Sequence, residues 1–295
     1  MLTIGVVNNM PPAAIASTER QFCDILTVAG REDIPFQIRW FRLSGARPAH
    51  YGRLKDLRDS ELDGLIITGA EPRAASLPDE PIWQPLTEIA DWAAQHTSSV
   101  IWSCLAAHAA VLYLDGVERR AHREKIFGIF DSVKIAEHAI LADTQDVWRV
   151  PHSRWNDLPE ADLDSRGYKV LAKSEDAGVD LFIKQFKRSL FVFIQTHPEY
   201  DVSTLLREYR RDVARFHNDG QNSYPKLPRN YFDSRVAAEL EAINGDSADE
   251  RKTRGLEILR RAELPDGWNP IAVQLYRNWL VNLVNNARTP EQAAV

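Results

Sequence analysis

Short apolar runs alternate with amphipathic stretches through the first half of the chain. Leu2–Val7 and Gly64–Gly69 are almost entirely apolar, as expected for strands that are buried on both faces. Pro35–Leu43 alternates apolar and polar residues, which also predicts a strand. Ser17–Ala29 and Pro85–Gln95 place apolar residues at helical spacing. This alternation of strand and helix predicts a parallel sheet with helices on both faces.

The middle of the chain is rich in β-forming residues, and the tail has a helical pattern. The expected strands are Lys125–Val133, Asp146–Val150, Val170–Lys173, Leu181–Gln185 and Leu190–Ile194. The expected tail helices are Thr204–His217, Val236–Ile243, Ala248–Leu259 and Ile271–Val284. We therefore predict an α/β fold: a mostly parallel central sheet with antiparallel additions and a helical C-terminal part.

No internal repeat, low-complexity tract or clean linker interrupts the sequence, which predicts a single domain. We divide it into an α/β core over residues 1–232 and a helical extension over residues 233–295. Asn218–Phe232 contains Gly, Pro and Asn residues and is predicted to be a loop. The final stretch, Asn285–Val295, is predicted to fray.

The composition is typical of a globular protein, because 44% of the 295 residues are hydrophobic and 26% are charged. The net charge of -6 argues against a nucleic-acid-binding protein. No apolar run is long enough to span a bilayer, and no basic segment precedes Leu2–Val7. We therefore expect neither a membrane anchor nor a signal peptide.

The chain has two cysteines, Cys23 and Cys104. Two cysteines are too few for a disulfide framework or a four-cysteine zinc site, so we expect no metal. Such sparse use fits a reducing cytoplasm, where we expect the protein to reside. Cys23 lies within a predicted helix and is interpreted as structural.

Cys104 lies where an apolar run, Ser98–Ser103, changes into a helical stretch. This pattern predicts a strand, a sharp turn that carries the thiol, and then a helix. Backbone N–H groups at the start of a helix favour a thiolate, so the position suits a nucleophile. The alternative is a buried structural cysteine.

A second candidate group ends another apolar strand, Phe191–Ile194, far along the chain. His197 follows this strand, Pro198 ends its ladder, and Glu199 is placed to orient the imidazole. Cysteine, histidine and carboxylate together are the components of a nucleophilic triad. For Glu199 the alternative is a solvated loop carboxylate.

Gly69 and Ala70 end a third strand and lie at the same predicted edge of the sheet. Their backbone N–H groups, with that of Leu105, are candidates for an oxyanion hole. The alternative is a plain turn glycine. The following residues lack the spacing of a phosphate-binding loop.

Several motifs, taken in order, resemble the homoserine O-acyltransferase (homoserine transsuccinylase) family. They are Asn8-Asn-Met-Pro11, Thr18-Glu-Arg-Gln21, Asp63-Gly-Leu-Ile-Ile-Thr-Gly-Ala70, Trp102-Ser-Cys-Leu-Ala-Ala-His-Ala-Ala110, Pro151-His-Ser-Arg154 and Thr196-His-Pro-Glu-Tyr-Asp201. The resemblance covers about Leu2–Phe232 and returns near Asn278-Trp-Leu280. It implies a flavodoxin-like, class I glutamine-amidotransferase-like three-layer sandwich.

The resemblance also implies ping-pong acyl transfer from an acyl-CoA, either succinyl-CoA or acetyl-CoA, to the hydroxyl of homoserine. Cys104 becomes acylated, His197 acts as base and Glu199 completes the triad. Lys125, Ser153 and Arg211 match substrate-binding positions. Without the resemblance, Lys125 and Arg211 are interpreted as solvated surface charges.

The resemblance further implies small-molecule partners, no permanently bound cofactor and a place in methionine biosynthesis. A homodimer is one assembly that we consider, and the sequence does not fix it.

Four departures from the family pattern bear on substrate identity. Arg73 occupies the position that sorts acyl donors, where typical members have Gly or Glu. Pro12-Ala-Ala-Ile15 replaces a segment with lysines, and His108 replaces a Gln. Ser234–Leu264 looks like an additional helical insertion. An Arg73 guanidinium suits the carboxylate of a succinyl group, and the alternative is that it indicates a different acyl donor.

Three alternatives remain open from the sequence. The acceptor is homoserine, serine or another hydroxy amino acid. A glutaminase of the amidotransferase type shares the same triad, although no synthase domain is visible. A non-catalytic binding protein on the same fold requires a broken triad, and this triad is complete.

Overall fold

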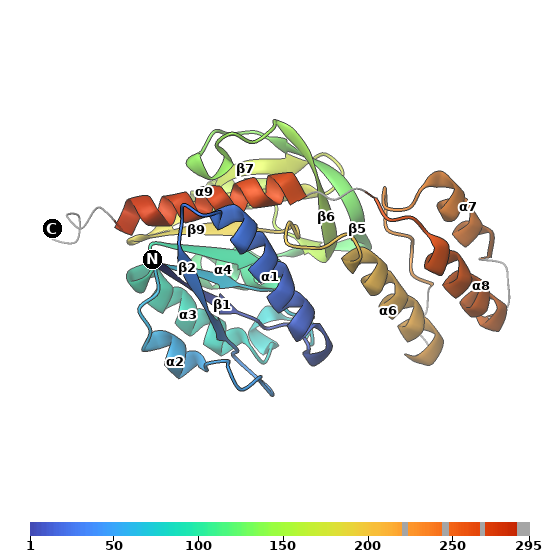
Figure 1. The fold of residues 1–295 in the computed structure, drawn as a ribbon, viewed down its shortest axis with the longest axis horizontal. Helices are drawn as coiled ribbons and strands as arrows, with labels where there is room; N and C mark the ends of the chain where they lie inside the picture. The colour runs from blue at the N-terminus through green and yellow to red at the C-terminus, as the bar shows by residue number, and fades with distance from the viewer. Residues whose placement is uncertain (220–223, 244–247, 266–268, 288–295) are drawn as a thin grey trace.

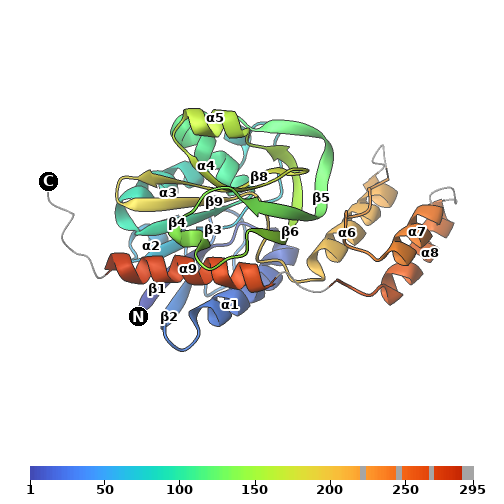
Figure 2. The same cartoon turned by 90° about the horizontal axis from the view of Figure 1, so that it is seen from above.

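The structure is a computed structural model that describes residues 1–219, 224–243, 248–265 and 269–287. Its centre is a nine-stranded mixed sheet with helices against both faces (Figures 1 and 2). Within the described ranges, no helix combines the length and apolar composition needed to cross a bilayer.

Five strands form the parallel part of the sheet, in the spatial order β2-β1-β3-β4-β9. They are β1 (Leu2–Val7), β2 (Phe36–Phe41), β3 (Gly64–Ile67), β4 (Ser99–Ser103) and β9 (Ser189–Ile194). Every residue of β3 and β4 is buried, as the apolar runs predict. In the β4–β9 pair Ser103 lies opposite Ile194, so the segments that leave these two strands begin at the same edge of the sheet.

The predicted antiparallel additions are confirmed, in the order β9-β8-β7-β5-β6. These strands are β5 (Arg120–Lys134), β6 (Val147–Asp157), β7 (Lys169–Ser174) and β8 (Gly178–Phe186). The structure extends β6 well beyond the predicted end at Val150. The strand continues through Pro151 because β6 lies at the edge of the sheet, next to β5, where Pro is tolerated.

Helices cover both faces of the sheet. Helices α1 (Ile15–Gly30) and α9 (Asn269–Ala287) share one hydrophobic cluster with the sheet. Helices α3 (Trp83–His96) and α4 (Leu105–Asp115) form a second cluster on the opposite face. Two short helices escaped prediction, α2 (Leu54–Arg58) and α5 (Glu160–Ser165), because one or two turns carry too little periodicity.

A third hydrophobic cluster lies beside the sheet. It joins α6 (Thr204–Asp219), α7 (Ser234–Ala242) and α8 (Ala248–Arg261) to Phe127 and Ile129 of β5. Figures 1 and 2 show these three helices together at one end of the molecule, apart from α9. The helices of the tail are thus divided between two places.

The loop and the end of the chain differ in part from the prediction. Residues 218–219 of the expected loop belong to α6, and residues 220–223 lie outside the described residues. Residues 285–287 form the last turn of α9 rather than a frayed end, and residues 288–295 again lie outside the described residues.

Candidate active site

Cys104 occupies the turn between β4 and α4. Its backbone has φ 50° and ψ -116°, a conformation that residues with a Cβ rarely adopt. The Cys104 N–H donates to the carbonyl of Ile194 at 2.7 Å, which fixes the turn against β9. The predicted strand, sharp turn and helix are therefore present, and the thiol is partly exposed at the start of α4.

His197 lies beside this turn and is buried. Its backbone N–H donates to the carbonyl of Pro151 at 2.9 Å, and its Nδ1 lies 2.8 Å from Oε1 of Glu199. Burial disfavours the imidazolium, but the Glu199 carboxylate and the Cys104 sulfur outweigh it and hold the pKa of His197 well above its usual value. The structure thus brings Cys104, His197 and Glu199 together.

A tyrosine supports the imidazole from one side. The rings of His197 and Tyr200 stack with centroids 4.2 Å apart and planes 17° apart. The Tyr200 hydroxyl donates to Oε1 of Glu208 at 2.7 Å. Burial and the Glu208 carboxylate raise the pKa of Tyr200 well above its usual value, so the phenol stays protonated. The imidazole plane is therefore linked to α6.

Two carboxylates on α6 contact the three predicted substrate-binding residues. Ser153 Oγ donates to Oε2 of Glu208 at 2.5 Å, and Lys125 Nζ lies 3.8 Å from the same oxygen. Lys125 Nζ also donates to Asp212 at 2.9 Å, and Arg211 pairs with Asp212 at 3.0 Å. All three predicted residues therefore share one acidic cluster.

The interpretation of Lys125 as a solvated surface charge is wrong. Its side chain is 16% exposed and its Nζ lies 4.0 Å from the centroid of the Phe127 ring. Glu208 and Asp212 were not among the site residues predicted from the sequence. Their spacing of four residues on one face of an amphipathic helix is the signal that could have revealed them.

The candidate oxyanion hole lies directly beside the thiol. A Cβ added to Gly69 would lie 3.3 Å from Cys104 Cβ and 3.3 Å from the Leu105 nitrogen, so the backbone at Gly69 packs tightly against the turn. Within the described part of the chain, the N–H groups of Gly69, Ala70 and Leu105 donate to no backbone carbonyl. They are therefore free to bind a negatively charged oxygen.

The loop after Gly69 is held by a buried carboxylate. Oε1 of Glu80 accepts hydrogen bonds from the Arg73 and Ala74 N–H groups, at 2.9 Å and 3.0 Å. The Arg73 side chain is exposed. Glu71 pairs with Arg215 of α6, which joins the loop to the acidic cluster.

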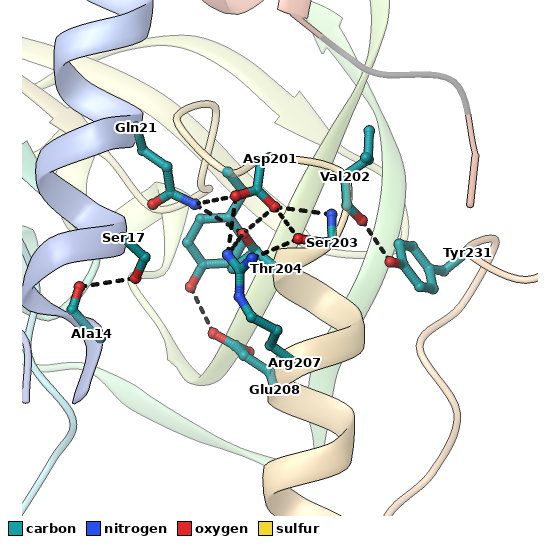
Figure 3. A network of polar contacts seen from close by, with 11 residues as sticks. Ala14, Ser17, Gln21, Asp201, Val202, Ser203, Thr204, Arg207, Glu208 and Tyr231 are labelled. Atoms are coloured by element: carbon teal, nitrogen blue, oxygen red, sulfur yellow. Dashed lines mark hydrogen bonds and ion pairs between the residues drawn. The ribbon is translucent and has the colours of Figure 1, made fainter. Parts of the chain in front are cut away.

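A network at the start of α6 positions this helix relative to α1. Figure 3 shows Asp201 between Gln21 and the first turn of α6. One Asp201 oxygen accepts from the Ser203 N–H at 2.9 Å, and the other pairs with Arg207 at 3.0 Å. Burial acts to raise the pKa of Asp201, but the hydrogen bonds from Ser203, Arg207 and Thr204 together lower it to about 2.

Sequence comparisons connect the whole chain to one group of proteins. A family model described as "HTS: Homoserine O-succinyltransferase" matches residues 1–290. The homoserine O-succinyltransferase of Rhodopseudomonas palustris is 42% identical over 298 residues, which cover 97% of this chain and 89% of that protein. The protein of the same name from Methylorubrum extorquens is 42% identical over 287 residues, covering 95% and 86%.

Solved structures with a similar fold are much more distant in sequence. A glutamine amidotransferase from Methylobacillus flagellatus has a TM-score of 0.54 and 18% identity, and covers 95% of this chain and 94% of its own. A glutamine amidotransferase from Thermotoga maritima has a TM-score of 0.50 and 14% identity, covering 96% and 98%. These similarities confirm the predicted amidotransferase-like fold.

Proposed function

Because this chain belongs to the homoserine O-succinyltransferase family, we propose that it moves a succinyl group from succinyl-CoA to the hydroxyl of homoserine through a thioester on Cys104. The observation that carries the proposed mechanism is the position of Cys104, in a strained turn beside a histidine that Glu199 orients. A thiol is nucleophilic as its thiolate, and the adjacent imidazolium stabilises that charge.

In the first half-reaction, the Cys104 thiolate attacks the thioester carbonyl of the donor. The carbonyl oxygen becomes negative in the tetrahedral intermediate, and we expect the N–H groups of Gly69, Ala70 and Leu105 to stabilise it. The close approach of Gly69 to Cys104 and Leu105 supports this role. The carbon–sulfur bond to CoA then breaks, and the departing thiolate takes the proton of the His197 imidazolium. Acyl-Cys104, neutral His197 and CoA remain.

The second half-reaction depends on the loss of charge at sulfur. The Cys104 sulfur is one of the groups that raise the pKa of His197, so forming the thioester removes part of this effect. Neutral His197 then accepts the proton of the acceptor hydroxyl, whose oxygen attacks the acyl carbon. The ester leaves, and Cys104 returns as a thiolate beside an imidazolium.

The acidic cluster on α6 suits a free amino acid. An amino acid carries a carboxylate and an ammonium group, and each needs an opposite charge. Arg211, whose side chain is 40% exposed, supplies a guanidinium for the carboxylate. Glu208 and Asp212 supply carboxylates for the ammonium group, and Lys125 and Ser153 hold them in place.

The proposed chemistry also bears on the compartment. Both cysteines are free thiols, and the mechanism requires that Cys104 stay reduced. A reducing cytoplasm maintains that state, so we propose that the enzyme acts there.

A mass measurement tests the mechanism. The protein is incubated with succinyl-CoA, acetyl-CoA or glutamine without an acceptor, and intact mass and peptide mapping locate any adduct. We expect an acyl adduct on Cys104 that homoserine removes with formation of the O-acyl ester. Cys104→Ala abolishes adduct and turnover, whereas the matched variant Cys23→Ala retains both.

The same assay separates the alternatives. If serine but not homoserine removed the adduct, the acceptor would be serine and not homoserine. A glutamyl adduct with ammonia release would indicate a glutaminase. Full turnover by Cys104→Ala would exclude the proposed mechanism.

A further inference from the structure

A histidine and an aspartate outside the triad form a buried pair beside the segment that carries His197. His152 of β6 is fully buried, and Asp180 of β8 is 2% exposed. Nε2 of His152 lies 3.2 Å from Oδ1 of Asp180. Among the described residues, no hydrogen bond of normal geometry reaches either nitrogen of this imidazole or either oxygen of this carboxylate. Within that part of the chain, the two side chains therefore have each other as polar partners and no hydrogen-bonding third group.

Burial makes this pair a poor source of stability. It lowers the pKa of His152, although the Asp180 carboxylate acts in the opposite direction, so the imidazole is neutral at neutral pH. A buried polar pair without further hydrogen bonds gains little over apolar side chains of similar size. Separating the two groups is costly, however, because each would remain buried without a partner. The pair therefore fixes the position of β6 relative to β8.

These two strands hold the segment that leads from β9 to His197. The Gln195 N–H donates to the carbonyl of Asp180 at 2.8 Å, and the His197 N–H donates to the carbonyl of Pro151 at 2.9 Å. Strands β7 and β5 lie between β8 and β6 in the sheet, so the two strands are not neighbours. The buried pair joins them directly at these two attachment points, since His152 follows Pro151.

The thiol and the imidazole of the triad are attached to different strands. The Cys104 N–H donates to the carbonyl of Ile194, which fixes the thiol turn to β9, the neighbour of β8. The backbone of His197 is bonded to β6 instead. The position of β6 relative to β8 therefore sets how the imidazole lies relative to the sulfur. A misplacement of about 1 Å between reacting groups can cost about a hundredfold in rate.

We propose that His152 and Asp180 are positioning residues, whose buried contact fixes the His197 imidazole relative to the reactive sulfur. This inference rests on the proposed acyl-transfer function and extends its machinery beyond the triad. Because both side chains are buried, they act through the two strands and through His197, not on the substrate. Loss of the contact should therefore slow proton transfer and leave binding of the acceptor intact.

Two substitutions that carry the same amide group test the contact. The amide of His152→Gln reaches the place of the imidazole Nε2 and still donates to Asp180, whereas the shorter His152→Asn does not reach it. Each protein is first acylated on Cys104, and transfer to homoserine is then followed in a single turnover by intact mass. We expect His152→Asn to lower the maximal rate at least about tenfold and His152→Gln to stay within about threefold of the parent protein. The half-saturating homoserine concentration should stay within about twofold in both.

The partner and a control pair complete the design. Asp180→Leu should slow transfer as His152→Asn does, and the double variant should be no slower, because both changes remove one contact. Lys184 is the matched control, since it lies on the same strand and pairs with Asp115 at 2.8 Å, but opposite Phe191 at the other end of β9. Lys184→Leu should leave the transfer rate within about twofold, whatever its effect on the melting temperature.

Equal transfer rates in His152→Gln and His152→Asn would overturn the inference, and this comparison decides even if Asp180→Leu does not fold. Losses that add in the double variant, or an equal loss in Lys184→Leu, would indicate general damage to the fold and overturn it as well. A raised half-saturating concentration at an unchanged maximal rate would assign the pair to acceptor binding. None of these results touches the proposed function, which fails only if the parent protein forms no acyl adduct on Cys104 with any donor.

Discussion

At the scale of single residues, the candidate site depends on where charge is placed relative to one sulfur. Glu199 and Cys104 together hold His197 protonated despite its burial. Gly69 allows a close approach of its backbone to Cys104 and Leu105, which an added Cβ would crowd. Arg73 adds an exposed positive charge on the loop that Glu80 holds. The first two features lie at the thiol, whereas Arg73 is the residue that we expect to affect the choice of acyl donor.

Arg73→Gly is expected to change donor preference more than the fold. The Arg73 N–H, which holds the loop to Glu80, is retained by glycine, while the exposed guanidinium is lost. We expect the ratio of kcat/KM for succinyl-CoA to that for acetyl-CoA to fall severalfold, with an unchanged melting temperature. An unchanged ratio between the two donors would refute a role for this side chain.

His108 provides a test of pH dependence. Its imidazole is buried and bonded to Gln195 at 2.7 Å, and burial lowers its pKa to about 3. An unfolded histidine has a pKa of about 6.5, so below that pH the unfolded state binds more protons than the folded state. This site therefore costs stability as the pH falls from about 6.5 toward 3, on the order of 2 kcal/mol at pH 5.

The measurement compares parent protein and His108→Gln by urea unfolding at pH 7.5 and pH 5. The amide N–H of glutamine can likewise donate to the Gln195 oxygen, and glutamine does not titrate. We expect the variant to lose less stability between the two pH values than the parent does. An identical loss in both proteins would show that His108 does not titrate on unfolding.

At the scale of elements, α6 links the triad to the acidic cluster. Tyr200 stacks on His197 and donates to Glu208 of α6, while Asp201 organises the start of the same helix. Gln21 of α1 donates to Thr204 at 2.8 Å, so α6 is also tied to the sheet-covering layer. A displacement of α6 would therefore disturb the triad and the acidic cluster together.

Asp201→Ala is expected to destabilise the protein by about 1 kcal/mol, the usual cost of losing a side-chain acceptor at the start of a helix. Its carboxylate is 36% exposed, so the pair with Arg207 adds little beyond this. Because the pKa is lowered to about 2, this stabilisation is present above about pH 4 and is lost as the pH falls toward 2. Urea unfolding between pH 7 and pH 2 measures both effects.

Asp24→Ala is the matched control, because Asp24 is an exposed carboxylate on α1. Its cost at neutral pH should stay within about 0.5 kcal/mol. If Asp201→Ala kept the acid dependence of the parent protein between pH 4 and pH 2, the network in Figure 3 would not be the cause.

At the scale of the whole molecule, α9 near the end of the chain packs against strands β3 and β4 near its beginning. Gly64 of β3 lies so close to α9 that an added Cβ would be 2.8 Å from Trp279 and 2.6 Å from Leu283. Trp279 is fully buried and its Nε1 donates to Ser99 of β4 at 3.0 Å. The end of the described chain is therefore part of the layer that covers β3 and β4, the strands that lead to Gly69 and Cys104.

Trp279→Ala is expected to destabilise the protein by about 3–5 kcal/mol, through lost burial and a cavity against the sheet. Trp155→Ala is the matched control, because Trp155 is 55% exposed. Its cost should stay within about 0.5 kcal/mol. Unfolding in urea compares the two, and equal costs would contradict the packing described for α9.

The sequence determined the elements and the reactive turn. Apolar runs in β3 and β4 and helical spacing in α1, α3 and α9 each reflect a local relation between neighbouring residues, which a linear pattern preserves. The sharp turn at Cys104 is also local, since strand, thiol and helix come one directly after another. The sequence also predicted His197 and Glu199 as site residues, because both follow the end of a strand and they lie two residues apart.

Only the tertiary structure decided which distant side chains share a site. Glu208 and Asp212 meet Lys125 and Ser153 because α6 packs against β5 and β6, and nothing local to α6 specifies that contact. Charge acts through space, so its effect is fixed only when the chain has brought the charges together.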